Sequence, residues 1–246
     1  MLQHILVATD FSPAWPQLAA QLARLPALGC QRVTLAYVIA AGYTQAPEVS
    51  HRDYYEQKLT EIATQLKQDT GLEVDWTVRF GSVASELVNA AQEVGAGTIL
   101  AGSQGHGVIR ELLLGSTVLN LARLADRPLL LAQIDNAGAK SLSHICRPLL
   151  ATDGSSAASG AEAAFLKLIP HCRHGVVVSV GRWEESEDAT EERETISKHV
   201  QALSERAGAD AFDTVLVGQG KPSEVITQVA REKDADLIIV GRRGRN

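Results

Sequence analysis

The chain repeats itself, and the repeat constrains the fold more than any other feature of the sequence. His4–Ser12 reads HILVATDFS and Arg147–Ser155 reads RPLLATDGS, so both halves begin with an apolar segment that ends in Ala-Thr-Asp-x-Ser. A second match pairs Gly81–Gly105 with Gly220–Gly244, where Ser-Glu opens an amphipathic segment, an apolar run follows, and Gly-x-x-Gly ends the match. Two copies of one pattern in 246 residues predict two related domains.

Within the first half, short apolar runs alternate with amphipathic segments of helical spacing. This alternation predicts a parallel sheet covered by helices on both faces, and right-handed crossovers then give an α/β doubly wound sheet. We expect strands near residues 4–9, 32–38, 72–79, 97–101 and 128–134. We expect helices near residues 13–28, 51–69, 84–94 and 115–125.

The repeat also predicts where the two domains lie. The first would occupy residues 1–134, a small polar linker residues 135–143, and the second domain residues 144–246. In the second half we expect strands near 145–152, 175–180, 212–218 and 236–241, after which the sequence stops just beyond its Gly-x-x-Gly. The second domain is therefore expected to lack its last helix and strand, either because the chain is truncated or because this copy is degenerate.

Composition excludes several classes of protein. The net charge of −6 argues against general binding to nucleic acid, which favours a basic surface. No apolar stretch reaches the length of about 18 residues that a membrane span needs, and the N-terminus runs directly into a strand pattern. The three cysteines are far apart and lack metal-binding spacing, as expected of reduced thiols. These features predict a soluble, cytoplasmic protein with no membrane partner.

The strongest chemical motif follows the fourth expected strand. Two residues separate Gly102 from Gly105, and after nine more residues come Gly115, Ser116 and Thr117 at the start of an expected helix. Glycines allow a ligand to approach the backbone, and a helix start offers free N–H groups that suit phosphate. The motif therefore predicts a nucleotide-phosphate site, although glycines between a strand and a helix are also ordinary turn residues.

Two side chains inside this motif have open roles. His106 and Arg110 could contact phosphate or could be exposed loop residues. The motif is not a P-loop, because no lysine precedes its Ser-Thr pair, and it is not a Rossmann fingerprint, because it follows a late strand.

A second candidate group lies at the end of the first expected strand. In a doubly wound sheet, ligands bind beyond the carboxyl ends of the strands, where the first and fourth strands are neighbours. Asp10 and Gly102 should therefore face one crevice. The carboxylate of Asp10 suits a ribose hydroxyl or an adenine amine, or else it is satisfied by N–H groups of its own turn.

These residues resemble the universal stress protein family. The family motif of Gly-x-x-Gly, nine residues and then Gly-Ser/Thr matches Gly102 to Ser116 without a gap, and Asp10 with Ser12 matches the end of the family's first strand. The resemblance implies tandem domains of the adenine nucleotide alpha hydrolase-like fold and, for the branch with this motif, ATP bound with Mg²⁺ or Mn²⁺. It places Asp10 near the adenosine, the backbone of Val38 against adenine, and the glycines and Ser116 on the phosphates.

The sequence thus predicts a stress-response protein that binds ATP in its first domain, as a regulatory or slowly hydrolysed ligand. We expect a weak ATPase at most, because no general base or arginine finger is evident. The alternative is an interaction module of the same fold that binds no nucleotide and acts as a homodimer or by pairing of its two domains. An ATP pyrophosphatase or adenylyl transferase is less favoured, since the loop after the first strand lacks adjacent glycines.

Overall fold

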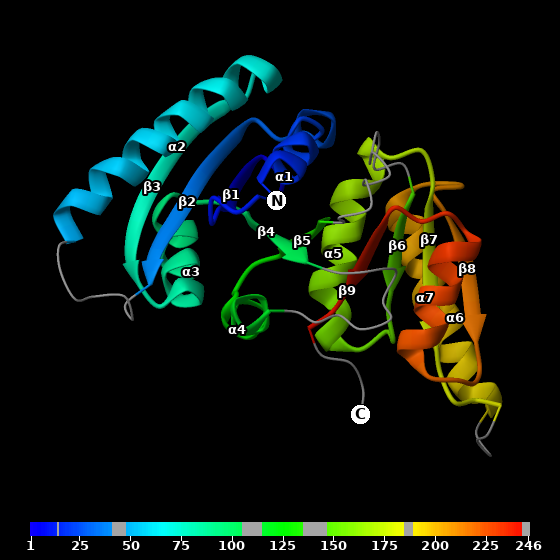
Figure 1. Ribbon diagram of the computed structural model, residues 1–246. Helices are drawn as coiled ribbons and strands as arrows, with labels where there is room; N and C mark the ends of the chain where they lie inside the picture. The colour runs from blue at the N-terminus through cyan, green and yellow to red at the C-terminus, as the bar shows by residue number, and fades with distance from the viewer. Residues whose placement is uncertain (14, 41–47, 105–114, 135–146, 185–188, 243–246) are drawn as a thin grey trace. The chain divides into compact units, whose positions relative to one another are not determined.

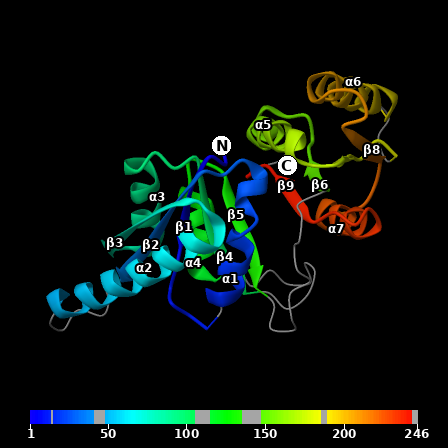
Figure 2. The ribbon, with the colours of Figure 1, turned by 90° about the horizontal axis from the view of Figure 1, so that it is seen from above.

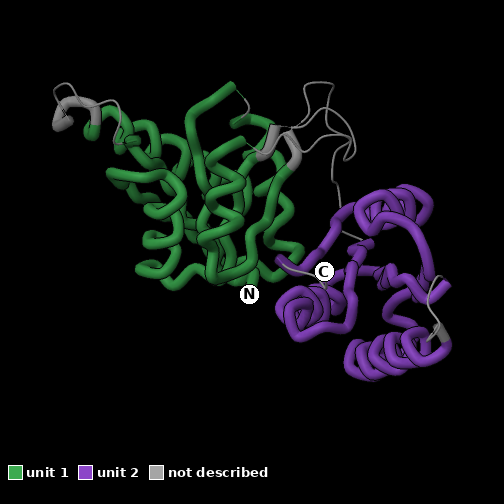
Figure 3. Tube along the Cα trace, turned by 90° about the horizontal axis from the view of Figure 1, so that it is seen from below, with its two compact units in different colours: residues 1–143 green, residues 144–246 purple. Residues whose placement is uncertain are grey.

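The computed structural model describes residues 1–13, 15–40, 48–104, 115–134, 147–184 and 189–242. The chain forms two compact units, Met1–Ser143 and His144–Asn246 (Figure 3). Each unit has its own sheet. The linker predicted at residues 135–143 lies outside the described residues.

Unit 1 contains a five-stranded parallel sheet in the order β3-β2-β1-β4-β5 (Figure 1). The strands match those expected from the apolar runs, with bounds of His4–Ala8 (β1), Arg32–Ala40 (β2), Glu73–Gly81 (β3), Thr98–Gln104 (β4) and Leu129–Ile134 (β5). Every strand pair is parallel. The order reverses direction at β1, which lies between β2 and β4, so β1 is the switch point at which such sheets bind ligands.

The helices of unit 1 cover both faces of this sheet. They are α1 (Trp15–Leu22), α2 (Glu48–Thr70), α3 (Val83–Glu93) and α4 (Ser116–Leu124). Figure 1 shows α2 and α3 on opposite faces of β2 and β3. The core under α3 and α4 is aliphatic, and among its buried members are Leu6, Val38, Leu87, Ile99 and Leu121.

One predicted helix was too long. The helix expected at residues 13–28 ends at Leu22, and a short 3-10 turn, Leu25–Leu28, follows it. Pro26 lies within this turn and has no N–H to donate to a continuing helix. Gly29 then adopts the left-handed conformation with φ 79°, and its N–H closes the turn on the carbonyl of Pro26 at 3.0 Å.

Unit 2 repeats the arrangement with four strands in its described part. The sheet order is β8-β7-β6-β9, in which β6 (Pro148–Ala151), β7 (Gly175–Val180), β8 (Phe212–Val217) and β9 (Leu237–Val240) correspond to β1, β2, β3 and β4. The longer helices are α5 (Ser159–Leu168), α6 (Ala189–Ala207) and α7 (Pro222–Glu232), with 3-10 turns at Ser156–Ala158 and Ile169–His171. Figure 2 shows α5 and α6 on one side of this sheet and α7 on the other.

The predicted fold class is therefore confirmed: two tandem doubly wound parallel-sheet domains. In the described residues, the second lacks the counterparts of α4 and β5.

Candidate functional site

The strand register brings three of the predicted site residues to one edge of unit 1. Ala8 of β1 pairs with Ala36 of β2, and Val7 pairs with Leu100 of β4. Two residues further along the strands, Asp10 therefore lies level with Val38 of β2. On the other side of β1, Thr9 lies level with Gly102 of β4. The N–H of Thr9 donates to the carbonyl of Ala36 at 3.0 Å, which carries the pairing beyond the end of β1.

Val38 has a side chain that is only 8% exposed and packs into the core beneath α3 and α4. Its side chain is therefore committed to the core. The backbone contact with adenine that the resemblance implies for Val38 stays a prediction.

The remaining described motif residues lie at the start of α4. Gly115 is the N-cap residue of this helix and has no side chain to cap it, and the first residues of the helix are Ser116 and Thr117. All three residues are exposed. The first N–H groups of an α-helix have no partner within the helix, and the positive end of its dipole favours an anion. Gly102 lies within β4, two residues before the strand's end. Gly105, His106 and Arg110 lie outside the described residues.

One carboxylate oxygen of Asp10 is engaged in a hydrogen bond within its own turn. Its Oδ1 accepts a hydrogen bond from the N–H of Ser12 at 2.9 Å, and the residue is exposed. The turn interpretation of Asp10 is thus correct for Oδ1. Among the described residues Oδ2 has no hydrogen-bond partner, so one oxygen of the carboxylate remains for a ligand.

Sequence reasoning missed an aromatic cluster beside this turn. The ring of Phe11 lies 4.7 Å from that of Tyr37 and 5.7 Å from that of Tyr55, centroid to centroid, and Tyr37 and Tyr55 are 4.2 Å apart. Burial raises the pKa of Tyr37, and contact with Tyr55 raises it further. Lys58 of α2 adds a cation whose Nζ lies 5.5 Å from the Phe11 ring centroid. One residue could have indicated this cluster from the sequence: Phe11 occupies the position that Gly154 occupies in the second copy of the repeat.

The corresponding edge of unit 2 is built differently. Asp153 closes the same turn by accepting the N–H of Ser155 at 2.9 Å. Behind the turn Glu162 is buried, with a side chain 6% exposed, and its Oε1 contacts the Thr152 hydroxyl at 2.5 Å and Nε2 of His199 at 2.8 Å. The hydroxyl of Ser155 is buried and has no hydrogen-bond partner among the described residues. This edge is therefore polar where unit 1 is aromatic.

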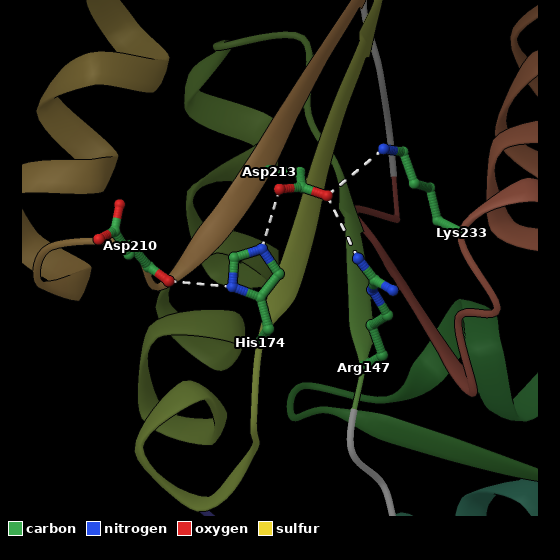
Figure 4. A network of polar contacts seen from close by, with 5 residues as sticks. All are labelled: Arg147, His174, Asp210, Asp213 and Lys233. Atoms are coloured by element: carbon green, nitrogen blue, oxygen red, sulfur yellow. Dashed lines mark hydrogen bonds and ion pairs between the residues drawn. The ribbon is translucent and has the colours of Figure 1, made fainter.

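A second charged network in unit 2 lies at the opposite end of the sheet, near the amino-terminal ends of the strands (Figure 4). Asp213, near the start of β8, contacts Nε2 of His174 at 3.0 Å through Oδ1, and its Oδ2 contacts Arg147 at 3.2 Å and Lys233 at 3.4 Å. Nδ1 of His174 contacts the carbonyl of Asp210 at 2.9 Å. The hydrogen bond with His174, helped by Lys233, holds the pKa of Asp213 below its usual value. Because ligands bind at the carboxyl ends of the strands, we interpret this network as structural.

Two negative findings apply to the described part of the chain. It contains no group of three or more His, Cys, Asp or Glu side chains that could hold a metal ion. None of its helices has the length and apolar character needed to cross a membrane.

Comparison with known proteins supports the resemblance. The model of the universal stress protein family matches residues 1–133 and 149–246. A universal stress protein of Mycolicibacterium smegmatis is 28% identical over 267 aligned positions, which cover 98% of this chain and 87% of the relative. One from Methanocaldococcus jannaschii is 26% identical and aligns with 56% of this chain and 98% of its own. A universal stress protein structure from Archaeoglobus fulgidus shares the fold, with a TM-score of 0.73 at 18% identity, over 97% of this chain and 84% of that one. The chain belongs to the universal stress protein family.

Proposed function

We propose that this protein is a cytoplasmic stress-response protein that binds ATP at the edge of unit 1 formed by β1, β2, β4 and the start of α4. The observation that carries the proposal is the convergence of an available Asp10 oxygen, the Val38 backbone and Gly102 at the switch point. The start of α4 at Gly115, a residue with no side chain to cap the helix, is followed by two exposed hydroxyl residues and adds an anion-binding element.

The chemistry of these groups favours a division of roles. Asp10 accepts hydrogen bonds and suits the ribose or the adenine amine, whereas N–H groups and hydroxyls suit phosphate oxygens. Gly102, Gly105 and Gly115 would let the phosphates approach the backbone, with Ser116, Thr117 and His106 beside them. Each charge-assisted bond contributes roughly 1.5–3 kcal/mol, so a few of them support micromolar affinity after the entropic cost of association.

A divalent cation fits this site as a companion of the nucleotide. The described residues contain no acidic or histidine cluster able to hold the ion alone, but Ser116 and Thr117 offer hydroxyl oxygens of the kind that Mg²⁺ or Mn²⁺ accepts alongside phosphate. The ion would neutralise phosphate charge. With Oδ1 of Asp10 engaged by the N–H of Ser12, we propose that the nucleotide is a regulatory ligand, hydrolysed weakly at most.

Isothermal titration with MgATP tests the proposal. A methyl group added at Gly115, whose φ is −52°, would meet no atom within 4 Å, so a Gly115→Ala, Ser116→Ala variant should fold normally. We expect one site in the wild-type protein and loss of that binding in the variant. A matched control is Ser159→Ala, Gly160→Ala in α5, because Gly160 also has free space for a methyl group. Equal binding by all three proteins, or no binding by any, would refute the proposal.

One observation favours a second function, an interaction module. In the described residues β9 pairs with β6 alone, whereas its counterpart β4 pairs with both β1 and β5, and Val240 at the end of β9 is 56% exposed. An open strand edge favours pairing with another strand. We therefore propose homodimerisation through this edge. Sedimentation equilibrium of the wild type and Val240→Lys should show a weaker dimer in the variant, and a concentration-independent monomer would contradict it.

A further inference from the structure

The β1–α1 turn and α2 line an open surface cavity of about 430 Å³. Its lining consists of Phe11, Ser12, Pro13, Trp15, Pro16, Lys58, Glu61 and Ile62, which we call the turn–α2 cavity. This volume lies within the range of small-molecule sites, and the lining matches their usual character of aromatic and apolar walls with a few polar groups. None of the residues proposed for the nucleotide lines the cavity.

Phe11 forms one wall at a conformational cost. Its φ is 55°, in the left-handed region where bulky residues are rare, and the equivalent residue of unit 2 is glycine, with φ 68°. The unusual backbone is accompanied by ring contacts with Tyr37 and Tyr55, the latter nearly parallel at 9°. Strain of this kind is concentrated at functional sites, because surrounding contacts must hold it in place. Unit 1 therefore places an aromatic ring at the position where unit 2 has a glycine.

Lys58 supplies the positive charge of this cavity. Its Nζ lies 5.5 Å from the centroid of Phe11 and 4.7 Å from that of Tyr54, and it has no ion pair within the described residues. On the same helix, Arg52 is paired with Glu56 at 2.7 Å. A half-buried ammonium beside aromatic rings, without a carboxylate partner, attracts an anion.

Glu61 limits how much negative charge the ligand can carry. It lines the same cavity one turn along α2, and its Oε1 accepts a hydrogen bond from the side-chain amide of Gln57 at 3.3 Å. A polyphosphate would be repelled by this carboxylate, whereas a single carboxylate group can bind Lys58 while a ring covers the apolar wall. The lining therefore suits a ligand with one negative charge better than a polyphosphate.

We propose that the turn–α2 cavity binds a planar aromatic monocarboxylate, with its ring against Phe11 and Trp15 and its carboxylate on Nζ of Lys58. This site is separate from the proposed nucleotide site, because the cavity lies on the α2 side of the sheet and the phosphate-binding residues lie at the start of α4.

The test is titration of the full chain with 2-naphthoate and with its neutral counterpart, 2-naphthamide. We expect saturable one-site binding with a preference for the carboxylate. Lys58→Gln should weaken naphthoate binding about tenfold and remove the preference, because the ion pair is lost. Phe11→Gly should weaken both ligands, and this substitution suits the backbone because Gly154 adopts the same conformation in unit 2. Lys67→Gln, on the last turn of α2, is the matched control and should bind like the wild type.

Three results would overturn the proposal: no saturable binding at millimolar naphthoate, equal affinity for naphthamide, or binding unchanged in Lys58→Gln. A further titration in saturating MgATP separates this site from the nucleotide site. Unchanged naphthoate affinity supports a distinct cavity, whereas competition would place naphthoate in the nucleotide site and contradict the proposal.

Discussion

The first turns of the two units have the same backbone and different surroundings. Asp10 and Asp153 each accept the N–H of the residue two positions later, at 2.9 Å in both units. The residue between is Phe11 in unit 1, with its ring in an aromatic cluster, and Gly154 in unit 2. Beside Gly154 lies the polar group of Thr152, Glu162 and His199. The comparison shows that the Ala-Thr-Asp-x-Ser repeat specifies the turn, while the residue at x and the facing helices decide which side chains surround it.

The largest difference in stability between the two turns should appear when the buried carboxylate of unit 2 is removed. Glu162→Ala leaves Thr152 and His199 without their shared acceptor, and losing one partner of a buried pair should cost about 3 kcal/mol of unfolding free energy. Urea unfolding in a Trp15→Phe, Trp76→Phe background, where Trp183 reports on unit 2, measures this cost. Glu205→Ala, at an exposed position of α6, should change nothing. Equal stability of the two variants would show that the polar group does not support the turn.

A smaller loss is expected when the glycine of the second turn gains a side chain. Gly154 has φ 68°, and a methyl group there would lie 3.2 Å from Cδ1 of Ile196 and 3.4 Å from Cγ of His199. Gly154→Ala should therefore cost about 1–2 kcal/mol, from the left-handed backbone and the tight contacts. Gly160→Ala serves as the control, since its methyl group meets no neighbour and alanine favours the helix. An unaffected Gly154→Ala variant would mean that the turn in unit 2 tolerates a side chain as readily as that of unit 1.

Substitution of the two aspartates distinguishes their contribution to turn formation from their contribution to ligand binding. Asp10→Ala and Asp153→Ala each remove the same hydrogen bond to a turn N–H, so each should lose about 1 kcal/mol of stability. On our proposal, Asp10→Ala alone should weaken MgATP binding, by about tenfold. Thermal denaturation and calorimetric titration of both variants measure the two quantities. Equal weakening of MgATP binding by both substitutions would place the nucleotide outside the proposed edge of unit 1.

The smallest effect concerns pH and belongs to unit 2. Contacts with His174 and Lys233 lower the pKa of Asp213 from its ordinary value of 3.8. A carboxyl group whose pKa is lower in the folded state stabilises the fold above the unfolded pKa, and this contribution is lost as pH falls through the folded value. Asp213→Asn should thus be less stable than the wild type at neutral pH, by a small amount because the group is partly exposed, and the difference should shrink below pH 3.8. A gap that persists unchanged in acid would contradict this, as measured by urea unfolding across the pH range.

The architecture was predictable because its signals are local. Buried strands such as Ile5–Val7 and Leu149–Leu150 appear as apolar runs, and the repeat allowed one half to be interpreted by the other. The exception was the helix expected at 13–28, where Pro26 outweighed the apolar periodicity. Alignment of Asp10 and Gly102 at one edge followed from the strand order, whereas Val38 was expected there only from the family resemblance.

The side-chain environment of the edges was not predictable in the same way. Phe11, Tyr37 and Tyr55 are distant in sequence, and their contact depends on a positive φ that no rule assigns to phenylalanine. Glu162 looks like an ordinary exposed residue of an amphipathic helix until His199, 37 positions away, is brought against it. Long-range pairs of this kind arise from tertiary packing, which periodicity does not encode.

Amide hydrogen exchange with and without MgATP tests the central claim most directly, because it reports each unit separately in the intact chain. The account predicts that MgATP slows exchange at the turn after Asp10 and in the first turn of α4, and leaves the turn after Asp153 unchanged. Protection in the Asp153 turn, or no protection in unit 1 when MgATP is bound, would contradict the claim that unit 1 is the nucleotide-binding domain.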